Sequence, residues 1–355
     1  MKIGILTSGG DCQALNAAMY GLVKTLYKNK SQEVQIYGIE DGYTGLIEGR
    51  YKIMAEKDFE EIQNLGGTIL GSSRQPFKKI NDLYDGEKTK LQLMIENYKK
   101  MKLDCLVVLG GNGSHKVANL LSEKGLNIIT LPKTIDNDIY GTDMTFGYAT
   151  ATDRAVEYID NLKSTAKSHK RIFIVEVMGN KAGWLTLNVG IATGADVILI
   201  PEIPYNIDEI SKCINEKISA GKKDIIVAVA EGIMTTQESE MSGKELKKIR
   251  GEETSSASRL EKQLRGKVNR EIRTAVIGHI QRGGNPNAYD RVLATRLGVM
   301  GAKAIIKKQF GNMMALVNGT IVNVPLKNTA GKKKIMENDS EIIKETENLG
   351  VNLGR

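Results

Sequence analysis

Short apolar segments recur along the chain, and each ends near Gly, Pro or Asp. They lie at residues 3–7, 105–110, 128–132, 172–178, 197–201 and 225–230 and are rich in Val, Ile and Leu. Segments of this kind are typical of strands buried on both faces of a parallel sheet. Between them, apolar residues recur at i, i+3, i+4 and i+7, as in 15–26 and 91–98, which predicts amphipathic helices. The alternation of strands and helices predicts an α/β fold with doubly wound layers.

The length of 355 residues favours two such α/β domains with a cleft between them. Segment 234–266 is polar, charged and rich in Ser, and we expect it to lie outside the core with helical segments at most. The tail beyond residue 327 is expected to form a final helix or a partly disordered end.

Composition excludes several classes of function. The three cysteines are widely separated and there are only three histidines, so the sequence offers no clustered structural metal site. No apolar run reaches the length of a membrane span, and we expect a cytoplasmic chain that is neither secreted nor embedded in a membrane. The net charge of +8 is compatible with phosphorylated ligands or nucleic acid, but five Phe and one Trp give little basis for base stacking. A solvated lysine surface is the simpler interpretation, and no nucleic-acid partner is expected.

Glycine-rich loops follow the first two predicted strands. T-S-G-G-D occupies 7–11 and G-G-N-G-S occupies 110–114, and a helical pattern follows each, at 115–123 in the second case. Ligands bind parallel sheets where strands end and helices begin, and glycine lets backbone N–H groups approach a phosphate closely. Each loop alone could equally be an ordinary strand-to-helix turn. The chain has no G-x-x-x-x-G-K-[ST] motif, and Lys116 stands where a dinucleotide fingerprint needs its third glycine.

The third strand ends in P-K-T-I-D-N-D at 132–138, which combines two carboxylates with a lysine. Transfer of a phosphoryl group to a hydroxyl group needs a carboxylate that accepts the proton, a Mg²⁺ ion, and cations that stabilise the moving charge. Asp136, Asp138 and Lys133 are of suitable type. The alternative at this position is a capped Asx turn without a metal.

Taken together, these motifs resemble the 6-phosphofructokinase family, whose members phosphorylate fructose 6-phosphate. The resemblance spans nearly the whole chain and rests on the order and spacing of T-S-G-G-D, G-S-S-R at 71–74, G-G-N-G-S, P-K-T-I-D-N-D, V-E-V-M-G at 175–179, A-E-G at 230–232 and G-H-I-Q-R-G-G at 278–284. It implies a nucleotide-binding domain of residues 1–146 plus 282–326 and a sugar-phosphate-binding domain of residues 147–281 plus 327–355. It also implies Mg²⁺ as cofactor and a homotetramer that shares its sites between subunits.

The resemblance implies transfer of the γ-phosphoryl group of ATP to the 1-hydroxyl group of fructose 6-phosphate. Asp136 would be the general base, supported by Thr134 and Asp138, while Gly10 and Arg74 would contact the phosphates being transferred. The nucleotide would be bound by Gly10, Tyr43, Arg74, Gly111, Asn112, Gly113 and Ser114.

The sugar phosphate would be bound by residues from both predicted domains. They are Thr134, Asp136, Arg171, Met178, Gly179, Glu231, Arg273, His279 and Arg282. By the same resemblance, Arg171 and Arg273 would reach in from a neighbouring subunit. Considered singly, Met178 would be a core methionine and His279 a satisfied core histidine.

Two positions select the phosphoryl donor in this family. Gly113 leaves space for a nucleotide where an aspartate would favour pyrophosphate, whereas Lys133 is lysine in pyrophosphate users and in some ATP users. The chain thus resembles a lysine-bearing branch that is related to pyrophosphate-dependent and mixed-substrate enzymes. ATP is the expected donor, and pyrophosphate is the alternative.

Asn112 departs from the family pattern, which usually has an acid there to hold the magnesium ion of the nucleotide. An amide supplies a neutral oxygen, so we expect weak metal binding at Asn112, and a low-activity regulatory paralogue is the rival hypothesis. The effector pocket of bacterial relatives is also changed. Tyr20, Lys24 and Lys163 stand where those enzymes have arginines, and lysine lacks the bidentate fork of arginine. We therefore expect near-hyperbolic kinetics.

Overall fold

The computed structural model describes residues 1–29, 33–250 and 255–355. The described chain divides into two compact units, Met1–Thr150 with Arg282–Lys334, and Ala151–Gln281 with Ile335–Arg355. One β-sheet belongs to each unit. The chain passes from one unit to the other at 150–151, 281–282 and 334–335.

The first unit is built on a seven-stranded sheet with the order β11-β10-β5-β4-β1-β2-β3. The five central strands run parallel, while the edge strands β3 and β11 are antiparallel to their neighbours. The strands are β1 (Lys2–Ser8), β2 (Gln35–Ile39), β3 (Tyr51–Met54), β4 (Cys105–Gly110), β5 (Ile128–Pro132), β10 (Asn312–Val317) and β11 (Thr320–Pro325). Both β4 and β5 are buried along their whole length, as their apolar sequences predict.

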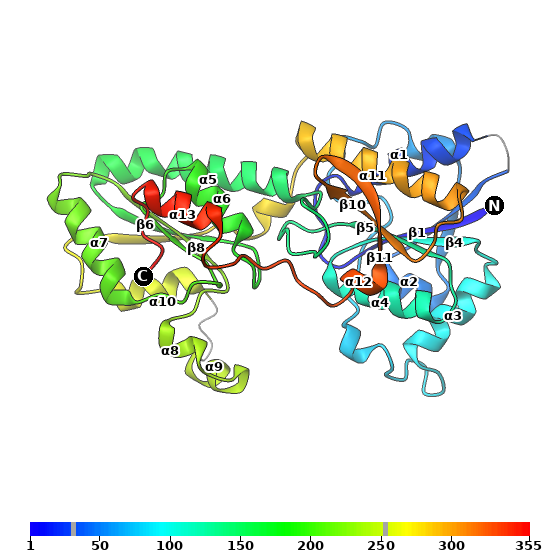
Figure 1. Ribbon diagram of the computed structural model, residues 1–355, viewed down its shortest axis with the longest axis horizontal. Coiled ribbons are helices and arrows are strands. Elements are labelled where there is room, and N and C mark those ends of the chain that lie inside the picture. The colour runs from blue at the N-terminus through cyan, green and yellow to red at the C-terminus, as the bar shows by residue number, and fades with distance from the viewer. Residues whose placement is uncertain (30–32, 251–254) are drawn as a thin grey trace. The chain divides into compact units, whose positions relative to one another are not determined.

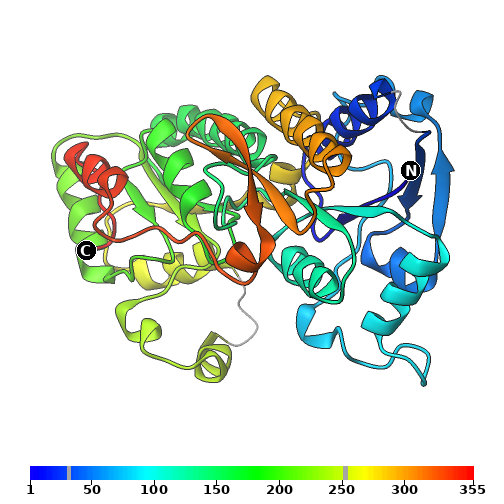
Figure 2. The same ribbon diagram turned by 45° about the vertical axis from the view of Figure 1, so that its right-hand side comes forward.

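Helices cover both faces of this sheet. On one face lie α1 (Leu15–Lys28) and α11 (Ala288–Ile306), and on the other lie α2 (Tyr43–Glu48), α3 (Lys90–Lys100), α4 (Asn112–Glu123) and α12 (Leu326–Thr329) (Figures 1 and 2). The close approach of α1 to α11 depends on glycine. A Cβ on Gly21 would lie 2.3 Å from the Thr295 carbonyl oxygen, and one on Gly298 would lie 2.1 Å from the Ala18 carbonyl oxygen. A larger residue at either position would therefore push the two helices apart.

The second unit contains a four-stranded parallel sheet with the order β7-β8-β6-β9. Its strands are β6 (Ile172–Val177), β7 (Val197–Leu199), β8 (Ile225–Ala230) and β9 (Ile272–Val276). Helices α5 (Tyr148–His169) and α6 (Trp184–Ala192) lie on one face, and α7 (Ile207–Ser219) and α10 (Ser256–Leu264) lie on the other (Figures 1 and 2). Among the described residues, this unit also contains the α-helices α8 (Thr236–Ser239), α9 (Gly243–Arg250) and α13 (Glu341–Asn348). Both sheets thus confirm the predicted doubly wound α/β class.

The prediction that 234–266 lies outside the core is wrong for its last part, and residues 251–254 of it lie outside the described chain. Ala257, Leu260 and Leu264 of α10 are fully buried in the core of the second unit, because they share one face of the helix. The tail beyond residue 327 forms a final helix, α13, and packs against the rest of the chain. Ile343 of α13 and Leu353 are buried, and residue 352 pairs with β7.

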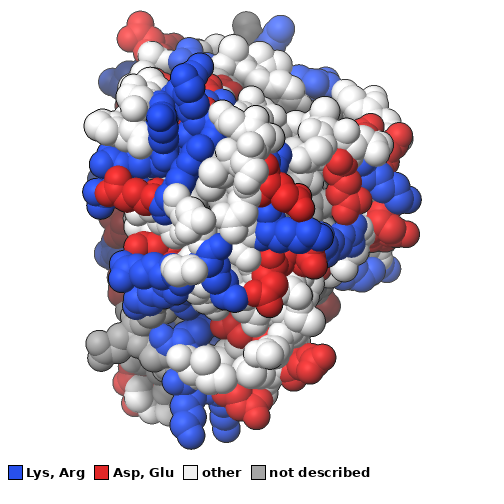
Figure 3. All heavy atoms as spheres, turned by 90° about the vertical axis from the view of Figure 1, so that its left-hand side faces the viewer, with Lys and Arg blue, Asp and Glu red and all other residues white. Residues whose placement is uncertain are grey.

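Charged side chains of both signs lie on the surface. Figure 3 shows Lys and Arg interspersed with Asp and Glu on one face of the molecule. Exposed ion pairs such as Lys88–Glu96, at 2.7 Å, occur in the first unit, and pairs of this kind contribute about 0–1 kcal/mol each. None of the described helices is long and apolar enough to cross a membrane.

Candidate active site

The carboxyl end of β1 forms a pocket over a glycine turn. The pocket has a volume of about 470 Å³ and is lined by Gly9, Gly10, Asp11, Thr68, Ser72, Ser73 and Arg74. Gly9 has a φ of +89°, which glycine adopts without strain. Its N–H donates to the Ser73 carbonyl oxygen at 2.9 Å, and the Ser72 hydroxyl donates to the Gly9 carbonyl oxygen at 2.7 Å. These bonds attach the G-S-S-R segment to the glycine turn.

Two guanidinium groups and an ammonium group converge on Gly10. A Cβ at this position would lie 3.0 Å from Arg282 Nη1 and 3.1 Å from Arg74 Nη2. Arg282 also donates to the Asp11 carbonyl oxygen at 2.8 Å, and Lys133 Nζ donates to the Gly10 carbonyl oxygen. Burial lowers the pKa of Lys133. A glycine here gives three cations access to one small space, an arrangement suited to binding phosphate groups.

The carboxyl end of β4 leads directly into α4. Asn112, Gly113 and Ser114 form the first turn of that helix, which begins earlier than the pattern at 115–123 predicts. Gly111 precedes the helix and provides no side-chain cap. The N–H groups of an uncapped helix N-terminus bind anions readily. The hydroxyl group of Ser114 donates to that of Ser8 at 3.0 Å, which joins this turn to the end of β1.

The structure does not support a contact between Tyr43 and adenosine. The Tyr43 ring is fully buried in the core of the first unit, and its hydroxyl group donates to the Ser114 carbonyl oxygen at 2.9 Å. Burial also raises the pKa of Tyr43. This residue therefore supports the start of α4 from within the core.

The carboxyl end of β5 carries both aspartates on a turn that is bonded at several points. The Asp136 N–H donates to Thr134 Oγ1 at 3.1 Å, and Asn137 has a left-handed φ of +51°. Thr145 donates through its hydroxyl group to the Thr134 carbonyl oxygen at 2.7 Å and through its N–H to Asn137 Oδ1 at 3.1 Å. Thr134 and Asp138 are buried, whereas Asp136 is partly exposed. The turn thus leaves Asp136 as the accessible carboxylate.

Hydrogen bonds join the three predicted loops at one edge of the sheet. Asn112 Nδ2 donates to the Asp138 carbonyl oxygen at 3.3 Å, which links the second loop to the third. The bond from Lys133 to Gly10 links the third loop to the first. The structure therefore brings the predicted phosphate-binding and catalytic residues of the first unit together, with Tyr43 contacting Ser114 from within the core.

Four predicted residues of the second unit lie at the carboxyl ends of its strands. Met178 and Gly179 follow β6, Glu231 follows β8, and His279 lies in the 3-10 helix Gly278–Arg282 after β9. The Met178 N–H donates to Gln281 Oε1 at 3.0 Å, which joins the ends of β6 and β9. His279 is exposed, so it is not a core histidine.

Arg171 and Arg273 lie at the opposite end of that sheet. Arg171 precedes β6, and Arg273 pairs in register with Phe173. Glu271 forms ion pairs with both guanidinium groups, at 2.5 Å in the case of Arg171, and this pairing lowers the pKa of Glu271. The length of β6 separates Arg171 from Met178 by roughly 20 Å. One chain therefore does not bring these two residues together.

Three residues that contact the predicted site residues were not predicted from the sequence. Ser72 lies inside the G-S-S-R motif, so the motif carried a signal for it. Glu271 is two residues from Arg273 in the sequence, but nothing marks it as the partner of Arg171. Lys333 contacts Asp138, and it belongs to a lysine run that composition assigns to a solvated surface.

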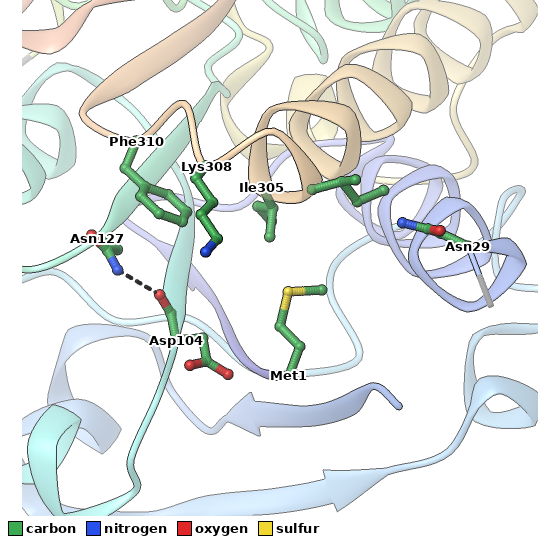
Figure 4. Close-up of a pocket in the computed structure, with 8 residues that line it drawn as sticks. Met1, Asn29, Asp104, Asn127, Ile305, Lys308 and Phe310 are labelled. Atoms are coloured by element: carbon green, nitrogen blue, oxygen red, sulfur yellow. Dashed lines mark hydrogen bonds between the residues drawn. The ribbon is translucent and has the colours of Figure 1, made fainter. Parts of the chain in front are cut away.

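Another pocket, of about 380 Å³, lies at the amino-terminal edge of the seven-stranded sheet (Figure 4). It is lined by Met1, Asn29, Asp104, Asn127, Ile305, Ile306, Lys308 and Phe310. Asn127 Nδ2 donates to the Asp104 carbonyl oxygen at 2.9 Å. None of the residues singled out from the sequence lines this pocket, so the carboxyl-terminal edge remains the candidate active site.

Comparisons with known proteins identify the family of the chain. A family model described as phosphofructokinase matches residues 2–305. The chain belongs to the phosphofructokinase family. The family resemblance and the fold class predicted from the sequence are thereby confirmed.

Relatives within the phosphofructokinase family match along the whole chain. The ATP-dependent 6-phosphofructokinase of Spirochaeta thermophila is 48% identical over 99% of this chain and 97% of its own length. ATP-dependent 6-phosphofructokinase 3 of Bacteroides thetaiotaomicron is 42% identical over 100% of both chains. The crystal structure of pyrophosphate-dependent phosphofructokinase from Nitrosospira multiformis has a TM-score of 0.79 at 19% identity, covering 99% of this chain and 88% of that one. This last likeness shows a shared fold.

Proposed function

We propose that this chain is an ATP-dependent 6-phosphofructokinase, which transfers the γ-phosphoryl group of ATP to the 1-hydroxyl group of fructose 6-phosphate in glycolysis. The observation that carries the proposal is the convergence of Arg74, Arg282 and Lys133 on Gly10, joined through Lys133 to the loop of Asp136. Two full-length relatives named as ATP-dependent support ATP as the donor. A cytoplasmic location is part of the proposal and is supported by three unpaired cysteines.

The first unit, Met1–Thr150 with Arg282–Lys334, is the proposed nucleotide-binding domain; it includes residues 147–150 and 327–334, which were predicted to belong to the sugar-phosphate-binding domain. The uncapped first turn of α4 would bind phosphate oxygens through the N–H groups of Asn112, Gly113 and Ser114. The transition state of phosphoryl transfer spreads negative charge over the equatorial oxygens of the moving group. Arg74 would stabilise that charge from its place above Gly10, since donors that are already positioned need little reorganisation.

Asp136 is the proposed general base. It is the partly exposed carboxylate of the third loop, and it interacts electrostatically with the buried Lys133. It would accept the proton of the sugar 1-hydroxyl as that oxygen attacks the γ-phosphorus. Thr134 accepts the N–H of Asp136, so its proposed role is to hold the turn.

The second unit, Ala151–Gln281 with Ile335–Arg355, is the proposed sugar-phosphate-binding domain. Met178, Gly179, Glu231 and His279 gather at the carboxyl ends of its strands. Because Arg171 and Arg273 lie at the other end of the same sheet, we assign them to the sugar phosphate of a neighbouring subunit. A homotetramer with shared sites is therefore part of the proposal.

Mg²⁺ is the proposed cofactor, and the site offers it one neutral protein ligand, the Asn112 side chain. The Asn112 amide nitrogen donates to the Asp138 carbonyl oxygen, which leaves the amide oxygen as the ligand atom of this side chain. Mg²⁺ prefers oxygen ligands and usually keeps several waters and nucleotide phosphates in its shell. When bound with ATP, the ion would neutralise part of the phosphate charge. Asn112 would hold it more weakly than a carboxylate.

Donor specificity tests the proposed function directly. We expect the purified chain to form fructose 1,6-bisphosphate from fructose 6-phosphate with ATP and to do so poorly with pyrophosphate. The opposite preference would make the chain a pyrophosphate-dependent enzyme, as Lys133 allows. Background rates with both donors would favour the regulatory paralogue.

Replacement of the proposed base tests the mechanism. Asp136→Asn should lower kcat by about 10² to 10⁴, because an amide cannot accept the proton, while KM for ATP changes little. The exposed Asp82 provides a matched control, since Asp82→Asn makes the same chemical change away from the site. An Asp136→Asn variant as fast as its parent would refute the assignment.

A further inference from the structure

A short segment at the end of the first unit, residues 332–334, pairs with the loop that carries the proposed base. Lys333 forms an antiparallel β-bridge with Ile139, and the Lys334 N–H donates to the Asp138 carbonyl oxygen at 2.9 Å. Lys333 Nζ lies 3.5 Å from Asp138 Oδ2. The Asp138 side chain is only 7% exposed, so the ammonium group offsets a charge that is unfavourable to bury alone.

The two flanking lysines contact the same loop through other groups. Lys334 Nζ donates to the Asp143 carbonyl oxygen at 2.7 Å and to that of Thr142 at 3.2 Å. Lys332 Nζ lies 5.3 Å from the centroid of the exposed Tyr140 ring. Each lysine of the segment therefore contacts the loop, but Lys332 meets an exposed ring, whereas the middle lysine reaches the buried carboxylate.

Asp138 also connects this segment to the start of α4. Its carbonyl oxygen accepts hydrogen bonds from Asn112 Nδ2 at 3.3 Å and from the Lys334 N–H at 2.9 Å, while its carboxylate faces Lys333. Asp136 is two residues away on the same turn. A shift of Asp138 would therefore move Asp136 relative to the phosphate-binding groups.

We propose that Lys333 is a positioning residue for phosphoryl transfer, whose ammonium group fixes the Asp138 carboxylate and thereby the turn that presents Asp136 to the sugar hydroxyl. This inference rests on the proposed function. A misplacement of about 1 Å in a reacting group can lower the rate on the order of 10²-fold. Loss of the ammonium group should thus reduce kcat more than the affinity for either substrate.

The test compares Lys333→Met, Lys333→Arg and the matched control Lys332→Met in steady-state assays. We expect Lys333→Met to lower kcat by about 10- to 100-fold with small changes in KM for ATP and fructose 6-phosphate. Lys333→Arg should restore most of the rate because its guanidinium group can still pair with Asp138, and Lys332→Met should resemble the parent. Equal losses in Lys333→Met and Lys332→Met, or no rescue by arginine, would overturn the inference.

A double-mutant cycle shows whether Lys333 acts through Asp138. In an Asp138→Asn background, Lys333→Met should reduce kcat little further, whereas independent residues would give additive losses and overturn the inference. Urea denaturation measures the free energy of unfolding of each variant. If the loss of rate is explained by a smaller fraction of folded protein, that result also counts against the inference. An inactive parent would refute the proposed function and this inference together. An active parent with an unimpaired Lys333→Met variant would refute this inference alone.

Discussion

The Lys133 ammonium group donates to the carbonyl oxygen of Gly10 and joins the carboxyl ends of β5 and β1. The two residues are 123 positions apart in the sequence. Lys133 is 2% exposed, and the guanidinium groups of Arg74 and Arg282 lie close to the same glycine. The bond therefore fixes the loop of the proposed base to the turn where the cations converge.

Lys133→Met keeps the aliphatic stem and removes this bond and its charge. We expect kcat to fall by roughly 10²-fold, a loss typical of removing one pre-positioned cation or donor. The free energy of unfolding should change by less than about 2 kcal/mol, because the lost hydrogen bond and the relief of burying a charge oppose each other. Steady-state kinetics and urea denaturation measure the two quantities. A large loss of stability with unchanged kcat would show that Lys133 is purely structural.

Gly113→Asp separates folding from nucleotide binding. A Cβ at Gly113 would meet no atom within 4 Å, and an acid in the first turn of a helix adds about 0.3–1 kcal/mol of stability. The variant should be at least as stable as its parent, yet its KM for ATP should rise about tenfold or more because the carboxylate repels phosphate. Thermal denaturation and ATP titrations check the two halves of this prediction.

Gly243→Asp is the matched control, since Gly243 also begins a helix and a Cβ there would meet no atom within 4 Å. It should leave KM for ATP unchanged. If both glycine variants bind ATP as the parent does, Gly113 does not border the nucleotide.

Asn112→Asp tests the weak magnesium ligand. A carboxylate binds Mg²⁺ more strongly than an amide, so the magnesium concentration that gives half the maximal rate should fall several-fold. The change also removes the donor to the Asp138 carbonyl oxygen. The increase in kcat at saturating magnesium should therefore be smaller than the increase in magnesium affinity. Rates of parent and variant over a magnesium series provide the measurement. Identical magnesium curves would exclude Asn112 as a ligand.

Lys24 bears on regulation, because its ammonium group is already paired. Lys24 Nζ lies 3.0 Å from a carboxylate oxygen of Glu56 and 2.9 Å from one of Glu60. An anionic effector would have to displace both carboxylates. We expect near-hyperbolic saturation by fructose 6-phosphate, with little response to ADP. Strong sigmoidality that ADP relieves would contradict this.

The sequence predicts features that are local in the chain. Runs such as 105–110 and 128–132 are apolar except for Thr130, and both form fully buried strands. Glycine loops and the P-K-T-I-D-N-D turn are contiguous motifs at strand ends, and parallel pairing of β1, β4 and β5 then brings them to one edge. The position of the candidate site therefore follows from strand order.

Features that depend on distant partners were beyond the sequence. Tyr43 was predicted to contact the nucleotide, but it is buried in the core and supports the start of α4 through its hydrogen bond to Ser114. Segment 234–266 is polar on average, so its composition did not indicate the apolar helix face formed by Ala257, Leu260 and Leu264. The partner of Lys333 is set by a β-bridge between segments far apart in the chain.

Lys334 predicts a pH dependence of stability. Burial lowers its pKa to about 8 from an ordinary value of 10.5, although Asp143 and Asp138 oppose the shift. Between these two pH values the unfolded chain holds a proton that the folded chain has released. The free energy of unfolding contributed by this lysine therefore rises with pH across that window.

Lys334→Met removes that contribution. We expect the free energy of unfolding of the parent, relative to that of the variant, to increase by about 1–3 kcal/mol between pH 7 and pH 10. Urea denaturation at several pH values measures the difference, and Lys332→Met, which removes a neighbouring exposed charge, serves as the control. Parallel curves for the parent and Lys334→Met would mean that Lys334 stays protonated in the folded chain throughout this range, held by the carbonyl oxygens of Thr142 and Asp143.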